Sequence, residues 1–269
     1  MDFLANYFGS LNPMSFLSAL PGNIAQGIIW GLMGLGVFLT FKLLNFADLS
    51  VDGSFATGGA VTAVMLINGC PVWATIIVAI LAGLAAGLVT GLLHTLLGIP
   101  DILAGILTQI ALYSINLNIM GKSNLPISYR NYTLVVSASN INMAILVGLG
   151  ICAVVIAAMY WYFGTEQGST IRSTGSNPAM SKAQGININF TKVIALALSN
   201  GLVALSGSLF AQYQGFADIN MGRGAIVIGL AAVIIGEVLG EAIFRKHMNF
   251  IIRMVRLYLH IMKNRKNRQ

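Results

Sequence analysis

Long blocks of apolar residues limit the possible folds of this sequence more than any other feature. A hydrocarbon core about 30 Å thick is crossed by roughly 20 helical residues, and several blocks reach that length. Continuous apolar runs favour helical spans over the short alternating strands of a membrane barrel. We expect an all-α, polytopic membrane protein whose hydrophobic spans, about seven in number, lie near residues 24–43, 54–69, 72–96, 100–119, 141–163, 191–213 and 224–240, the second of them short.

The composition agrees with this class, because 57% of the residues are hydrophobic and only 9% are charged. Soluble domains carry far more charge. The first twenty residues lack a basic segment and are interrupted by proline, which favours an interfacial helix over a cleaved signal peptide. Cys70 and Cys152 show no metal-ligand spacing, and His94 is expected at a helix interface, so we expect no metal site and no cofactor.

Positive charge gathers at the end of the chain. Eight of the fifteen Lys and Arg residues lie in 245–268, so the formal net charge of +7 belongs to this tail and does not indicate nucleic-acid binding. Basic residues beside membrane spans stay in the cytoplasm. The tail is therefore expected inside, and the polar segment 165–190, two spans earlier, lies on the same side.

That polar segment predicts a short capped helix. Asn177 followed by Pro178 is a typical helix start, and Gly185 suits the left-handed residue that ends a helix. The predicted helix is too short to span a membrane and too polar to enter lipid. Two interpretations remain open: a solvated connecting loop, or a docking helix for a cytoplasmic partner.

Two stretches that begin Phe-Ala-Asp indicate an internal repeat. FADLSVDGSFATGGAV starts at Phe46 and FADINMGRGAIVIGLAAV starts at Phe216, and each runs into a Gly-rich apolar span. The span count places the two copies on opposite membrane faces. Such an inverted repeat is characteristic of transporters, whose substrate route lies between the halves.

Acidic residues near these copies have two possible roles. Asp48, Asp52 and Asp218 could cap helices, or they could line a translocation path together with Ser50. Asp101, which follows a proline, is expected in the first turn of a helix. The recurring glycines Gly83, Gly87 and Gly91 are expected to let another helix approach closely.

The sequence contains no phosphate-binding loop, zinc-protease motif, nucleophile elbow or paired Cys motif, so we expect no enzyme. Uphill transport would therefore need an ion gradient or a separate subunit that hydrolyses ATP.

Two motifs resemble a known family. Gly168, Arg172, Gly175, Asn177, Gly185 and Ile186 form a G-x-x-x-R-x-x-G-x-N…G-I pattern, and Asp48 to Val51 match an Asp-Leu-Ser-Val segment, with Asp52 inserted before the glycine. Both patterns are similar to permease subunits of ATP-binding cassette (ABC) importers of the branched-chain amino acid and ribose type, nearest an amino acid subgroup with tryptophan-like substrates.

The resemblance implies a bacterial cytoplasmic-membrane protein and several partners: a second copy of the chain, an ABC-type ATPase, and an extracytoplasmic solute-binding lipoprotein. It also implies that the ATPase contacts the coupling segment, with these residues involved: Arg172, Gly175, Asn177, Pro178, Met180, Lys182, Ala183 and Gly185.

The end of the sequence departs from the family pattern. We expect a permease domain in 1–240, with the coupling loop in 165–190, and a basic tail in 241–269 that reflects truncation or a frame shift, leaving the second half of the repeat incomplete. Two alternatives follow. An ion-gradient-driven secondary transporter would need no ATPase, and a truncated, non-transporting membrane protein would show no solute-dependent activity.

Overall fold

The computed structural model describes residues 13–127 and 134–244, and nearly all of them are helical. The helices are α2 (Pro13–Val37), its π-helical continuation η1 (Phe38–Leu43), α3 (Val51–Ile67), α4 (Val72–Leu96), α5 (Asp101–Met120), α6 (Ile141–Phe163), α7 (Glu166–Ser176), α8 (Pro178–Ala183), α9 (Ile188–Gln214) and α10 (Ala225–Phe244). Two short strands, β1 (Asn124–Pro126) and β2 (Phe216–Asp218), complete the described fold. The expected all-α architecture is confirmed.

Each of the seven predicted hydrophobic segments is a helix. Five helical segments in the described chain are long and apolar enough to cross a membrane: Ser18–Leu43, Val72–Leu96, Asp101–Met120, Ile141–Phe163 and Ile188–Gln214. Two further apolar helical segments, Val51–Ile67 and Ala225–Leu239, are shorter. The first of these corresponds to the span that the sequence predicted to be short.

The chain forms two compact units, residues 1–230 and 231–269. Within the first unit α9 is the central helix, since it packs against α2, α3 and α4 and most of its length is buried. The described part of the second unit, 231–244, continues α10 and exposes large apolar side chains such as Ile234 and Val238.

The glycine stripe of α4 allows a close helix contact, as the sequence predicted, and the structure shows that the partner is α9. A Cβ atom on Gly87 would overlap the carbonyl oxygen of Leu196, and one on Gly83 would overlap that of Asn200. Because glycine has no side chain, the two backbones approach closely and gain dispersion contacts along their length.

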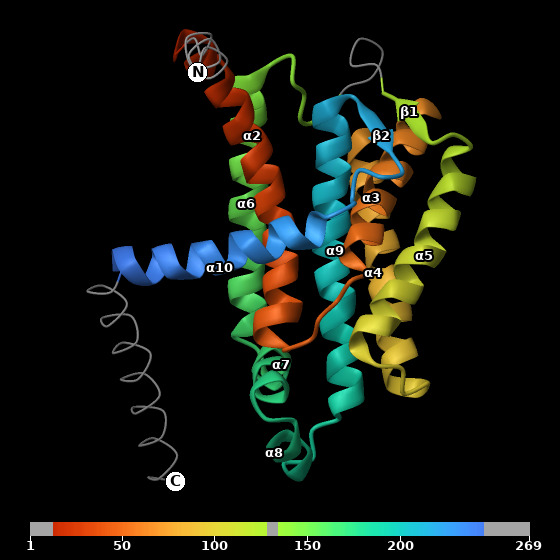
Figure 1. Ribbon diagram of the computed structural model, residues 1–269, viewed down its shortest axis with the longest axis vertical. Coiled ribbons are helices and arrows are strands. Elements are labelled where there is room, and N and C mark those ends of the chain that lie inside the picture. Colours follow the sequence, from red (N-terminus) through yellow and green to blue (C-terminus); the bar gives the residue numbers. More distant parts are fainter. Residues whose placement is uncertain (1–12, 128–133, 245–269) are drawn as a thin grey trace, which may run out of the picture. The chain divides into compact units, whose positions relative to one another are not determined.

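The two ends of α9 carry different features (Figure 1). At its start, α7 and α8 form a compact pair outside the main bundle, whereas β1 and β2 lie beside its end. The strands pair antiparallel, with Leu125 opposite Ala217. This strand pair ties the segment after α5 to the link between α9 and α10.

Candidate functional site

The polar segment begins with a helix that the sequence did not predict. Thr165 starts α7, and its hydroxyl accepts a hydrogen bond from the amide nitrogen of Gly168 at 3.5 Å. Ile171 is buried in a cluster with Phe46 and Leu196, so α7 has an apolar anchor in an otherwise polar sequence. The helix was not predicted because the composition of this segment is mostly polar.

Two residues of the predicted coupling motif hold α7 in place. The Arg172 guanidinium donates a hydrogen bond to the carbonyl oxygen of Phe163, the last residue of α6, at 3.0 Å. Gly175 lies so close to η1 that a Cβ atom there would overlap the carbonyl oxygen of Leu43. Arg172 and Gly175 therefore fix α7 to α6 and η1, and contact with an ATPase remains a prediction for both.

The short helix α8 follows the predicted pattern. The Asn177 side chain accepts a hydrogen bond from the amide of Met180 at 3.0 Å, and Pro178 occupies the first turn. Gly185 has φ of +81°, and the Ile186 amide bonds the Ser181 carbonyl at 3.1 Å, which closes the C-terminal end.

The outer surface of α8 is available to a partner. Met180 exposes 57% of its surface, and Lys182 and Ala183 are also exposed, whereas Ser181 faces inward. Met180 and Ala183 therefore offer a partner an apolar surface, and Lys182 adds a positive charge at its edge.

Asp48 lies in the segment before α3 and is buried against the middle of α9. Its carboxylate accepts hydrogen bonds from the amide and hydroxyl of Ser50, and from the Asn200 side-chain nitrogen at 2.7 Å. Both Asp48 and Ser50 are almost completely buried. They join α9 to the segment before α3, so their place in a translocation path stays a prediction.

The Asp52 carboxylate caps the start of α10 and not the start of α3, the helix to which Asp52 belongs. Its carboxylate accepts hydrogen bonds from the amides of Gly224, at 3.0 Å, and Ile226, at 2.9 Å, at the start of α10. The carboxylate of one copy of the Phe-Ala-Asp repeat thus bonds the helix start of the other.

Asp218 is the last residue of β2 and belongs to the strand pair. It accepts hydrogen bonds from the Asn220 amide at 2.7 Å and from the Asn124 side chain at 3.3 Å, across the strand pair. This carboxylate stabilises the link between α9 and α10.

A cavity of about 280 Å³ opens beside Asp52. Its polar lining is Asp52, Gln109, Tyr113, Asn116 and Arg223, and Gly53, Ala56, Ile110 and Ile219 complete its walls. Asp52 alone among the four predicted path residues lines it. The α5 residues were not predicted from the sequence because their polar side chains are spread through an apolar helix.

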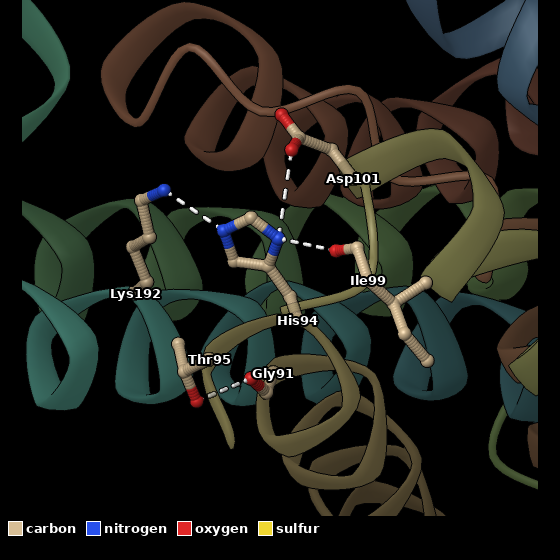
Figure 2. A network of polar contacts seen from close by, with 6 residues as sticks. All are labelled: Gly91, His94, Thr95, Ile99, Asp101 and Lys192. Atoms are coloured by element: carbon tan, nitrogen blue, oxygen red, sulfur yellow. Dashed lines mark hydrogen bonds and ion pairs between the residues drawn. The ribbon is translucent and has the colours of Figure 1, made fainter. Parts of the chain in front are cut away.

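A second polar network joins three helices near the start of α9 (Figure 2). The imidazole of His94 on α4 lies between Lys192 of α9, with Nε2 to Nζ at 2.9 Å, and the start of α5. Its Nδ1 lies 2.9 Å from the Ile99 carbonyl oxygen and 3.5 Å from the Asp101 carboxylate. This arrangement suits a neutral ring that donates from Nδ1 and accepts from Lys192 at Nε2. The prediction of an interfacial histidine is confirmed.

Residues 22–253 match the family described as the permease component of branched-chain amino acid transport systems. The chain belongs to this permease family. Membership confirms the resemblance to ABC importer permeases and supports a transport subunit of the bacterial plasma membrane over an ion-gradient-driven transporter.

Several curated proteins are similar over most of the chain. A tyrosine transport system permease protein of Clostridioides difficile is 45% identical over 221 residues, which covers 82% of this permease and 73% of the relative. An uncharacterized protein of Rickettsia prowazekii is 32% identical over 80% of this permease and 75% of its own length. The D-allose transport system permease protein AlsC of Escherichia coli is 28% identical over 85% and 71%. No solved structure matches this permease.

Proposed function

We propose that this permease forms the membrane path of an ABC importer for an amino acid, driven by a separate ATPase that docks on α8. The family description and the name of the Clostridioides difficile relative both support an amino acid as the solute class. By the family resemblance, two copies of the chain work together and an extracytoplasmic binding protein delivers the solute.

The observation that carries this proposal is the capped, outward-facing α8. An isolated helix of six residues is marginal in water because nucleation is costly. Here Asn177 fixes one end and Gly185 the other, so Met180, Lys182 and Ala183 are presented on a preformed surface. Preorganisation lowers the cost of binding a partner.

The elements around α8 supply a mechanical connection. Its partner helix α7 is bonded to α6 through Arg172, and only four residues separate the end of α8 at Ala183 from the start of α9. Lys192, in the second turn of α9, contacts His94, which in turn contacts the first residue of α5. Movement of α8 would thereby reach α5, which lines the cavity.

We expect the double variant Asn177→Ala with Gly185→Val to lose ATP-driven uptake while it still inserts into the membrane. Loss of an N-cap costs about 1 kcal/mol, and a β-branched residue at positive φ costs roughly 1–2 kcal/mol more, so α8 unwinds. The measurement is uptake of labelled amino acids by vesicles that contain the assembled transporter and internal ATP.

Asn187→Ala is the matched control, because it removes the same kind of cap from the much longer α9. The control should retain uptake, since α9 is held by packing. Uptake by the double variant equal to that of the control would refute the role of α8.

A further inference from the structure

The side chain of Asn116 on α5 lacks the hydrogen bonds that a buried amide needs. It is only 1% exposed, and neither its nitrogen nor its oxygen has a partner. Among the described residues it is the only buried amide side chain with both ends unpaired. Buried polar groups are normally satisfied because an unpaired one is costly. Asn116 lines the cavity beside Asp52, so a bound solute could supply the missing partners.

Neighbouring residues of α5 present further polar groups to the same cavity. Gln109 and Tyr113 also line it, and they lie seven and three residues before Asn116, which places all three on one face of the helix. The amides of Gln109 and Asn116 each offer both a donor and an acceptor, and Tyr113 adds a hydroxyl.

The cavity also contains one group of each charge. Asp52 is fixed by two backbone amides at the start of α10, and a carboxylate so bonded keeps lone pairs for another donor. Arg223 is exposed where it lines the cavity, and no ion pair joins it to Asp52 within the described residues. Its planar guanidinium suits a carboxylate.

We infer that this cavity is a transport subsite for a free α-amino acid. The α-ammonium bonds Asp52, the α-carboxylate bonds Arg223, and Asn116 pairs with a polar group of the solute. A volume of about 280 Å³ lies just below the roughly 300–1,000 Å³ typical of ligand sites, which suits one small solute. A neutral sugar would leave both charges unused. The inference rests on the proposed transport function and adds to it the residues that recognise the solute.

The test compares Asn116→Leu with Asn118→Leu in the complete transporter, reconstituted in vesicles with its ATPase and binding protein. Both variants make the same chemical change on α5, but Asn118 is exposed and does not line the cavity. Initial uptake is measured with each of the twenty standard L-amino acids in labelled form. We expect Asn116→Leu to lower kcat/KM for the transported amino acid by about tenfold or more, and Asn118→Leu to match the wild type.

Arg223→Gln is the second variant, because its exposed position makes misfolding an improbable cause of any loss. It should raise KM by about tenfold, the usual effect of losing one charge-assisted bond. Detergent-extracted yield and retention of the ATPase are measured for every variant, so that a loss of assembly is not mistaken for a loss of recognition.

The outcomes separate the two proposals. If the wild type takes up an amino acid and both Asn116→Leu and Arg223→Gln do so with wild-type kinetics, the subsite is overturned. The importer function would be unaffected by that result. If Asn116→Leu fails to assemble, the KM of Arg223→Gln alone tests the subsite, and a wild-type KM would overturn it. Absence of ATP-dependent uptake of every amino acid by the wild type would overturn the proposed function and the subsite together.

Discussion

Asp48 shows how a single buried carboxylate can organise this membrane fold. It is 2% exposed and lies between the amide of Ser50 and the side chain of Asn200, which also donates to the Leu196 carbonyl at 3.1 Å. An ionisable group at such a position is costly unless its oxygens are bonded. The hydrogen-bonded pair of Asp48 and Asn200 therefore fixes the segment before α3 to the middle of α9.

Replacement of Asn200 by Leu should destabilise the protein by about 1–3 kcal/mol, because the Asp48 carboxylate then loses its partner on α9. Thermal unfolding in detergent measures the effect. The exchange variant, Asp48→Asn with Asn200→Asp, should recover part of the loss, since an amide and a carboxylate again face each other. Equal stability of Asn200→Leu and the wild type would show that the pair contributes nothing.

At the scale of residues, the sequence left open whether Asp52 caps a helix or lines a path, and in the structure its carboxylate bonds the start of α10, 172 residues away at the Gly224 amide. The family resemblance implied that Arg172 contacts an ATPase, and in the structure Arg172 bonds the end of α6. Local rules describe what a side chain can do, whereas tertiary packing decides which backbone it meets.

At the scale of elements, the contact between α4 and α9 is the most extensive helix packing in the described fold. Gly83, Gly87 and Gly91 all meet the α9 backbone or the Cβ of its residues. The spacing of four residues was visible in the sequence and predicted a close helix pair, although only the structure identifies α9 as the partner.

We predict that Gly87→Ala will lower stability by about 1–3 kcal/mol, the usual effect of overpacking a tight interface. Gly150→Ala on α6 is the control, because nothing lies within 4 Å of a Cβ atom there. The control should be neutral or slightly stabilising, since alanine favours helix. Thermal unfolding of both variants is the measurement, and equal melting temperatures would contradict the packing argument.

Elements with strong local signals were predictable, and others were not. The long apolar helices and the capped α8 follow from composition, an N-cap and a terminal glycine. The helix α7 was missed because only one of its three buried residues, Ile171, is a large apolar side chain. The pairing of β1 with β2 was missed because three-residue strands carry no periodic signal.

At the scale of the whole molecule, the two Phe-Ala-Asp copies pack against different parts of α9. Phe46 belongs to the cluster with Ala195 and Leu196 near its start, and Ala217 to the cluster with Ala211 near its end. The bond from Asp52 to the start of α10 connects the two copies, and the inverted repeat remains a prediction.

The predicted division of the chain into a permease domain, 1–240, and a basic tail, 241–269, remains a prediction. Residues 245–269 lie outside the described part of the chain, and with them most of the cationic charge. Truncation or a frame shift as the origin of this tail is likewise untested.

The central claim is that this permease works with a separate ATPase bound at α8. The most direct measurement is affinity purification of the tagged chain from gently solubilised membranes, followed by mass spectrometry. We predict that an ABC-type ATPase and a solute-binding lipoprotein co-purify with the chain, and that the ATPase is lost from the Asn177→Ala, Gly185→Val variant but kept by Asn187→Ala. Recovery of a folded wild-type chain without any ATPase would contradict the account.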